Sequence, residues 1–221
     1  MDEIITKTKQ TGRGYRMGNA EIKIMCYADD AVIVSEDEAN LQRLLYKFEQ
    51  TTNKYKIEIY TRKTQSLTIS KEPRRCKLAV YNQSVEQVMA FKYLGANITS
   101  NRNLKEEVRN QRSKATLISG YLRDIIWRNK HMSIGSKVRI YKTCVRPVMT
   151  YAAETRAENT TTKRLVRTTG MRVLRSVTGH TLYDMKKSEE IRDTCKVSDV
   201  VRWTRARRRA WRDHVERMAD D

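Results

Sequence analysis

The sequence predicts an α+β fold in which antiparallel hairpins and one packed helix are followed by a mostly helical part. Two apolar, β-prone runs flank a short acidic stretch within residues 22–34, which is typical of a hairpin. From about residue 103 the apolar residues recur at alternating steps of four and three, which is typical of amphipathic helices. At 221 residues the chain is long enough for one large domain or two small ones. We divide it into three sections, residues 1–100, 101–155 and 156–221.

The charge of the chain indicates its partners more than its fold. Lys and Arg number 45 against 26 Asp and Glu, a net charge of +19, so we expect a polyanionic partner. No apolar run approaches the length needed to cross a bilayer, which favours nucleic acid over a membrane. The four cysteines form no CxxC pair, which indicates a reduced, intracellular protein. The spacing of Cys195 and His214 fits no finger, so we predict no zinc site.

The first section is organised around the acidic hairpin. Residues 1–20 are polar and are predicted to be a loose lead-in that ends in a Gly18-Asn19 turn. Ala28, Asp29 and Asp30 then separate the two apolar runs, so both carboxylates lie at a tight turn. Neighbouring carboxylates repel each other, and a hard cation such as Mg²⁺ or Mn²⁺ offsets that repulsion. The alternative is a turn in which the aspartates only cap their own backbone.

A helix and several strands are predicted after the hairpin. Ser35 and Glu38 have the spacing of a capping box, and apolar residues at helical intervals extend to about Asn53. This helix should pack on the hairpin. Strand character returns in residues 56–60, 66–69 and 77–81.

Two long helices are predicted in the second section. The first covers residues 103–127, with Asn103 at its N-terminus and an apolar stripe from Leu104 to Ile125. The second covers residues 136–155, with Pro147 as a kink.

The third section is strongly basic. A helical stretch with no intervening acid is followed by a last helix that Asp199 caps. Arginines interleaved with Trp203 and Trp211 suit phosphate contacts and stacking. The alternative is a helix whose tryptophans face a core and whose arginines are merely solvated. The nucleic-acid-binding candidates are Arg202, Arg205, Arg207, Arg208, Arg209 and Arg212.

The run Tyr27-Ala28-Asp29-Asp30, with its apolar flanks, resembles the catalytic hairpin of reverse transcriptases of non-LTR retrotransposons. Lys63 falls where that family carries a lysine thought to assist pyrophosphate departure, although Lys56 and Tyr60 depart from the family's pattern there. A run further on resembles the family's primer grip, which holds the primer end: Phe91, Tyr93, Leu94 and Gly95.

The resemblance implies a partial polymerase palm in residues 1–100, a helical thumb in 101–155 and a basic C-terminal helical region in 156–221. It implies an RNA-directed DNA polymerase, a nucleotidyltransferase that uses Mg²⁺ or Mn²⁺ at Asp29 and Asp30, with Lys63 as a further catalytic residue. Its partners would be an RNA template, a DNA primer and, when the enzyme is complete, dNTP. An intracellular, nuclear location is implied too.

Two metal ions usually need a further carboxylate from a neighbouring strand. The only earlier acids are Asp2, Glu3 and Glu21, and none has the place of that carboxylate. We therefore expect a fragment of a transposable-element polymerase that lacks the fingers and the front of the palm and is inactive by itself. The alternative is a non-catalytic nucleic-acid-binding module derived from a retroelement. Attachment to a membrane surface is disfavoured because arginines surround the last helix.

Overall fold

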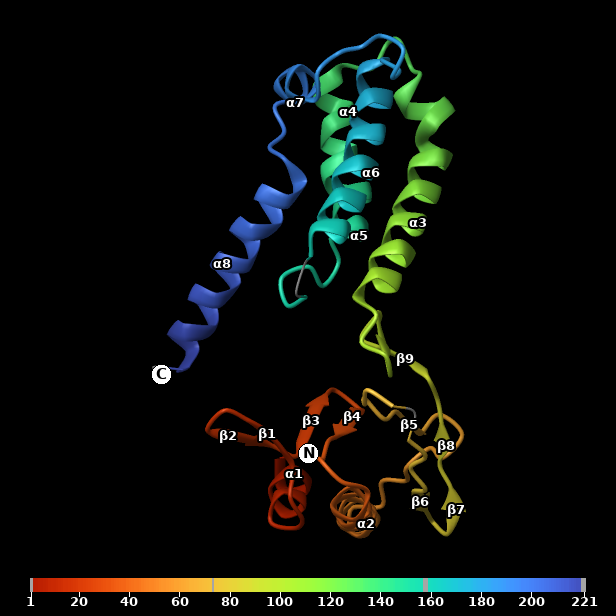
Figure 1. Ribbon diagram of the computed structural model, residues 1–221, viewed down its shortest axis with the longest axis vertical. Coiled ribbons are helices and arrows are strands. Elements are labelled where there is room, and N and C mark those ends of the chain that lie inside the picture. The colour runs from red at the N-terminus through yellow and green to blue at the C-terminus, as the bar shows by residue number, and fades with distance from the viewer. Residues whose placement is uncertain (1, 73, 157–158, 220–221) are drawn as a thin grey trace. The chain divides into compact units, whose positions relative to one another are not determined.

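A computed structural model describes residues 2–72, 74–156 and 159–219, and it confirms the predicted α+β fold (Figure 1). The chain divides into two compact units. Unit 1 comprises Met1–Lys92 and Ile98–Arg102, and unit 2 comprises Tyr93–Asn97 and Asn103–Asp221. None of the helices in the described residues has both the length and the apolar character that crossing a bilayer requires.

In chain order the strands are β1 Tyr15–Met17, β2 Ala20–Ile22, β3 Ile24–Tyr27, β4 Asp30–Ile33, β5 Gln65–Ser66, β6 Ala79–Val80, β7 Gln83–Ser84, β8 Glu86–Gln87, β9 Ala90–Tyr93 and β10 Ala96–Thr99. They form two-stranded sheets. The pairs β1–β2, β3–β4 and β6–β7 are antiparallel, whereas β5 pairs with β8 in parallel.

Unit 1 contains two helices, α1 (Asp2–Lys9) and α2 (Glu38–Lys54), which lie against each other (Figure 1). Ile4 from α1, Ile24 from β3 and Phe48 from α2 form one buried cluster. A second cluster lies around Leu45 and the strands near residues 78–85. The helix α2 therefore packs on the hairpin, as the sequence predicts.

Three expectations for unit 1 were wrong. Residues 1–20 are not a loose lead-in, because α1 and β1 lie there, although Gly18-Asn19 does form the turn to β2. The cap of α2 is Asp37, whose carboxylate accepts a hydrogen bond from the amide of Asn40 at 2.7 Å. Ser35 instead donates to the carbonyl of Arg13. Residues 56–60 form no strand, and only Gln65–Ser66 of the next predicted strand pairs with a neighbour.

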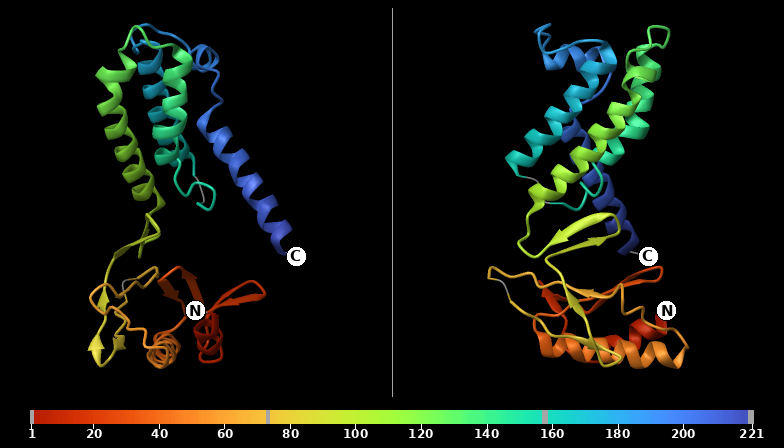
Figure 2. Two further views of the ribbon diagram at one scale, coloured as in Figure 1. Left: turned by 180° about the vertical axis from the view of Figure 1, so that it is seen from behind. Right: turned by 90° about the vertical axis from the view of Figure 1, so that its right-hand side faces the viewer.

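Unit 2 consists of helices, the loops between them, and the tip of the β9–β10 hairpin (Tyr93–Asn97). Its helices α3 and α6 lie against each other (Figure 2). In chain order the helices are α3 Leu104–Leu122, η1 Arg123–Trp127, α4 Ile134–Ile140, η2 Tyr141–Val145, α5 Arg146–Met149, α6 Thr160–Thr178, α7 Ser188–Cys195 and α8 Val200–Ala219.

In the described residues of unit 2, the π-helical segment η1 ends α3, and a second one, η2, joins α4 to α5. A π turn takes up an extra residue, so the apolar stripe of α3 passes from Leu122 to Trp127, which is 2% exposed. Ile125, predicted to end that stripe, is 71% exposed, so the prediction was wrong at this residue. The second predicted helix also ends earlier than expected, at Met149.

Candidate functional site

The acidic hairpin forms as predicted, with β3 paired to β4 in antiparallel register. Ile24 lies opposite Ile33, and Tyr27 lies opposite Asp30, so Ala28 and Asp29 are the two residues of the turn. Ala28 has a left-handed backbone, with φ of 51°, which permits this tight connection.

Alternation along the strands assigns the two faces of the hairpin. Ile24 and Ile33 face the buried cluster below, whereas Met25 and Tyr27 are exposed on the opposite face. Because cross-strand partners share a face, Asp30 projects on the exposed face with Tyr27. The apolar face thus fixes the hairpin while both carboxylates remain open to solvent.

A divalent cation is compatible with this donor set. Mg²⁺ in phosphoryl-transfer sites is commonly held by one or two carboxylates, with water and substrate phosphates completing its shell. Asp29 and Asp30 supply two adjacent carboxylates. In the described residues no group of three or more Asp, Glu, His or Cys side chains is placed to hold a metal ion. The hairpin therefore offers a partial site rather than a closed protein cage.

Lys63 lies in the turn that follows α2, at residues 61–63. Its ammonium lies 5.4 Å from the centroid of the Tyr60 ring, and no hydrogen bond or ion pair between described residues joins it to the acidic hairpin. The position of Lys63 thus shows an exposed cation and leaves its catalytic role a prediction.

The four residues that resemble a primer grip lie on the β9–β10 hairpin. Leu94 and Gly95 are its turn, and both have left-handed φ values, of 47° and 83°. A Cβ at Gly95 would lie 3.2 Å from the hydroxyl oxygen of Tyr151, so this turn and Tyr151 are in close contact. The Tyr151 hydroxyl donates a hydrogen bond to the carbonyl of Leu94, which ties the turn to the segment after α5. Phe91 and Tyr93 are half-buried on β9.

The basic helix α8 is capped by Asp199, as predicted. Its carboxylate accepts hydrogen bonds from the amides of Val201 and Arg202, both at 3.1 Å. Val200 and Val201 are buried in the core of unit 2, and the helix is exposed from Arg209 to Met218. Figure 1 shows α8 in blue, with its first turns near α6.

The arginines of α8 do not all face solvent. Arg208 donates to the carbonyls of Ala153, Glu154 and Arg156, at 3.0 Å or less, and so closes the loop after α5. Arg207 lies 6.0 Å from the Trp203 ring, and Arg212 is 3.6 Å from the carboxylate of Glu216. Apart from Arg208, which is half-buried, the candidate arginines of α8 are exposed: Arg202, Arg205, Arg207, Arg209 and Arg212.

Trp203 and Trp211 have different environments. Trp203 is half-buried, and the guanidinium of Arg146 lies 4.2 Å from its ring centroid. Burial lowers the pKa of Arg146 from its usual value, and the neighbouring aromatic face offsets part of the desolvation. Trp211 is 50% exposed and lies near His214. Trp203 is therefore a packing residue, whereas Trp211 is available for stacking.

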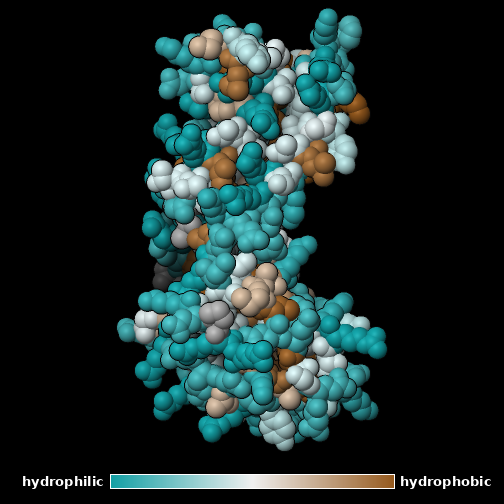
Figure 3. Space-filling view, turned by 45° about the vertical axis from the view of Figure 1, so that its right-hand side comes forward, coloured by the Kyte–Doolittle hydropathy of each residue, from teal (hydrophilic) through white to brown (hydrophobic). Residues whose placement is uncertain are grey.

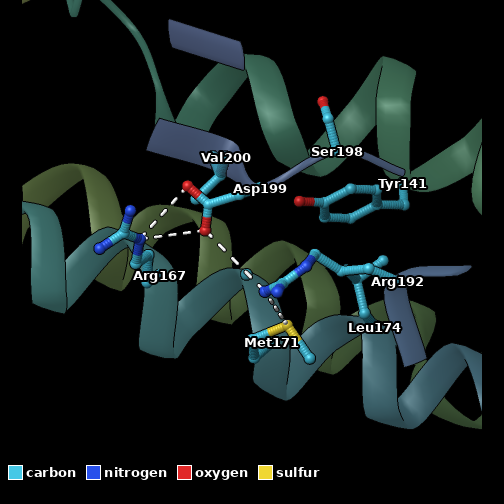
Figure 4. Close-up of a pocket in the computed structure, with 9 residues that line it drawn as sticks. Tyr141, Arg167, Met171, Leu174, Arg192, Ser198, Asp199 and Val200 are labelled. Carbon is cyan, nitrogen blue, oxygen red and sulfur yellow. Dashed lines mark hydrogen bonds and ion pairs between the residues drawn. The ribbon is translucent and has the colours of Figure 1, made fainter. Parts of the chain in front are cut away.

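Sequence reasoning missed the residues that α8 meets on its neighbours. Arg167 on α6 and Arg192 on α7 both pair with Asp199, with nitrogen–oxygen distances of 3.0 and 3.9 Å. Figure 4 shows these three side chains converging from three elements. Arg167 stood in a recognisably basic helical stretch, but nothing in the linear sequence indicates which of its arginines face α8.

Comparisons with known proteins support the resemblance to reverse transcriptases that the hairpin residues carry. Residues 1–98 match the family model described as reverse transcriptase (RNA-dependent DNA polymerase). A transposon-derived protein of Caenorhabditis elegans is 25% identical over 216 residues, which cover 93% of this chain and 75% of that protein. No solved structure matches this chain significantly.

Two further relatives are named as the RNA-directed DNA polymerase from the mobile element jockey. The protein of Drosophila melanogaster is 25% identical over 142 residues, which cover 61% of this chain and 15% of that polymerase. The protein of Drosophila funebris is 28% identical over 149 residues, which cover 62% of this chain and 16% of that polymerase. The chain thus spans about one sixth of the length of these two polymerases.

Proposed function

We propose that the chain is part of the RNA-directed DNA polymerase of a non-LTR retrotransposon, because residues 1–98 match the reverse transcriptase family and two relatives carry that name. Residues 1–100 are the rear of the palm, residues 101–155 the thumb and residues 156–221 a basic C-terminal region. The observation that carries this proposal is the pair of exposed carboxylates, Asp29 and Asp30, on a hairpin anchored by its apolar face.

In the complete enzyme Asp29 and Asp30 hold Mg²⁺ or Mn²⁺. When bound, the cation lowers the pKa of the primer hydroxyl and offsets the charge that develops on the phosphate. The hairpin contributes orientation, because Ile24 and Ile33 fix its lower face and leave Asp30 on the open one. Lys63 donates a proton to the departing pyrophosphate or stabilises its negative charge.

The primer grip consists of Phe91, Tyr93, Leu94 and Gly95. Glycine at the turn lets the backbone approach a ligand closely, and the hydrogen bond from Tyr151 to Leu94 holds the turn in shape. The template is RNA and the growing strand is DNA, and the basic C-terminal region adds contacts to their phosphates. A polymerase of this kind acts inside the cell, in the nucleus.

Synthesis by this chain alone should be weak or absent. Two metal ions need more carboxylate ligands than the hairpin offers, and the described residues hold no further acid beside it. A primer-extension assay with purified chain, an RNA template annealed to a DNA primer, dNTPs and Mg²⁺ tests this expectation. Robust elongation would contradict it.

Binding of a cation by the hairpin can be measured without polymerisation. Tyr27 lies opposite Asp30, so it should sensitise the luminescence of Tb³⁺ bound at the two carboxylates. We expect saturable luminescence that Mg²⁺ or Mn²⁺ displaces and that Asp29→Asn and Asp30→Asn abolish. The control is Asp193→Asn, an exposed acid on α7, which should leave the signal unchanged. Equal signals from all three variants would overturn the metal assignment.

A second candidate is a non-catalytic nucleic-acid-binding module, favoured by the lack of a third carboxylate beside the hairpin in the described residues. The two proposals differ in what Asp29→Asn does. In a polymerase assembled with its missing part, this variant abolishes synthesis and leaves duplex binding intact. In a binding module, synthesis is absent whether residue 29 is Asp or Asn.

A further inference from the structure

A hollow of about 600 Å³ lies where α6, α7 and the start of α8 meet in unit 2. Its lining side chains come from each of these elements, and we call it the arginine hollow. They are Arg167 on α6, Arg192 on α7, Asp199 before α8, and Arg202 and Arg205 on the first turns of α8.

The charges around the arginine hollow do not balance. Four guanidinium groups against one carboxylate leave a net charge of +3. Asp199 already has partners. It forms ion pairs with Arg167 and Arg192, and it accepts hydrogen bonds from two backbone amides of α8. Burial raises the pKa of Asp199, but the hydrogen bonds from Arg167 and Arg202 outweigh it and hold the pKa below its usual value. Asp199 therefore stays ionised at neutral pH. Even so, the positive charge of the four arginines in the described lining exceeds its single negative charge.

Asp199 positions two of the arginines without using up their donors. Arg167 contacts both carboxylate oxygens through its Nε, at 3.2 and 3.0 Å. Its two terminal nitrogens make no hydrogen bond among the described residues, and half of the side chain is exposed. Figure 4 shows these nitrogens turned away from Asp199. Arg192 is held between Asp199 and the sulfur of Met171 and is 21% exposed.

A small cavity of about 10 Å³ shares Arg167, Arg192 and Asp199 with the arginine hollow. Its lining also includes Tyr141 and Leu174, and it has room for about one water molecule. An occupant of the hollow therefore meets guanidinium groups rather than a deep apolar pocket. No aromatic side chain lines the hollow, so the described lining offers no surface on which a base could stack.

We infer that the arginine hollow binds the phosphodiester groups of a nucleic-acid strand. Guanidinium forks match phosphate oxygens in pairs, and preorganised arginines lose less entropy on binding than free ones. Because the contacts go to phosphate and not to bases, binding here is independent of sequence and falls steeply with salt. This inference rests on the proposed nucleic-acid function, and it extends the interface from α8 to Arg167 and Arg192.

The test measures the affinity of the full chain for a fluorescein-labelled RNA–DNA duplex between about 50 and 200 mM salt. The variant Arg167→Gln/Arg192→Gln should bind about tenfold more weakly and lower the slope of log K against log salt by about 2. The matched control is Arg172→Gln, an exposed arginine on α6 outside the hollow, which should change the slope little. Duplexes of two unrelated sequences should bind the wild-type chain equally.

The variant Arg167→Gln/Arg192→Gln also removes both arginine partners of Asp199, so it could lower stability. Its folding is therefore checked by tryptophan fluorescence before binding is measured. A single variant, Arg205→Gln, removes a hollow arginine that makes no ion pair with the described residues and should lower the slope by about 1. If Arg205→Gln and the folded double variant change the affinity and the salt slope as little as Arg172→Gln does, the arginine hollow is not a phosphate site. The proposed function would still stand. If the wild-type chain binds no duplex at the lowest salt, the proposed nucleic-acid function fails with it.

Discussion

The Nε of Arg167 lies 3.2 and 3.0 Å from the two carboxylate oxygens of Asp199, a residue 32 positions further along the chain. The same carboxylate caps α8 through two amides. One side chain therefore fixes both the start of the basic helix and its attachment to α6. The loss of this carboxylate should affect helix formation and tertiary packing together.

Replacement of Asp199 by Asn should destabilise unit 2 by about 1–2 kcal/mol at pH 7, through the lost ion pairs and a weaker cap. The pKa of Asp199 is lowered in the folded chain. A lowered pKa contributes stability above the unfolded value, about 3.9, and this stability is lost as pH falls through the folded value. The difference between wild type and variant should therefore shrink as pH falls below the unfolded value and through the lowered folded pKa of Asp199. Urea unfolding followed by tryptophan fluorescence measures this, since all three tryptophans lie in unit 2.

The exposed variant Asp193→Asn provides the control for that experiment. Asp193→Asn should not change the urea midpoint of unfolding beyond experimental error, either at pH 7 or at low pH. An Asp199→Asn chain that stays equally less stable at low pH would show that the carboxylate charge is not the cause.

Replacement of Arg208 by Gln should release the loop at residues 153–156. The guanidinium donates to three carbonyls of this loop, and a neutral amide of shorter reach cannot satisfy them all. We expect faster amide exchange in that loop, whereas Arg209→Gln, on an exposed neighbour, should leave it unchanged. We also expect Arg208→Gln to change the salt dependence of duplex binding less than Arg205→Gln does. A larger change would assign Arg208 to phosphate contact.

Replacement of Gly95 by Ala should cost more than replacement of Gly179, although both glycines have left-handed φ, of 83° and 73°. Either alanine pays about 1–2 kcal/mol for that backbone conformation. A Cβ at Gly95 also meets the Tyr151 hydroxyl at 3.2 Å, whereas nothing lies within 4 Å of one at Gly179. Urea unfolding of unit 2 measures both variants. Adding Tyr151→Phe should narrow the gap between them, and a gap that does not change would rule out this contact as its cause.

Replacement of Leu44 by Ala should destabilise unit 1 by about 2–5 kcal/mol, because this side chain on α2 is fully buried. Tyr46→Ala, on the exposed side of the same helix, is the control and should cost much less. Far-UV circular dichroism should show an earlier thermal transition for Leu44→Ala. Tryptophan fluorescence should show no change in unit 2, which holds all the tryptophans. A shift of both signals would mean that the two units unfold together.

The hairpin at residues 22–34 was predictable because its signals are local. Alternating apolar residues and a short acidic turn determine a β3–β4 register that needs no distant partner. The resemblance carried by Tyr27-Ala28-Asp29-Asp30 was confirmed by the reverse transcriptase match over residues 1–98. The cap at Asp199 was predictable for the same reason, as a single carboxylate before a helical run.

Other features depended on contacts that the linear sequence does not reveal. Ser35 was predicted to cap α2, but Asp37 is the cap, and the Ser35 hydroxyl donates a hydrogen bond to the carbonyl of Arg13 instead. The π turn η1 changed the helical phase, so Trp127 is buried where Ile125 was expected. Arg208 differs from its neighbours on α8 because three loop carbonyls lie within reach of its guanidinium. The roles of Lys63 and of the primer-grip residues stay predictions.

The small sheets also have a practical consequence for handling the protein. In the described residues each sheet has two strands, so one edge of every strand lacks a neighbouring strand. Figure 3 shows brown, hydrophobic side chains in separate groups on a mostly teal face. An open strand edge can recruit a strand from another molecule. Concentrated preparations should therefore self-associate, and the binding and unfolding measurements belong in dilute solution, with light scattering as the check.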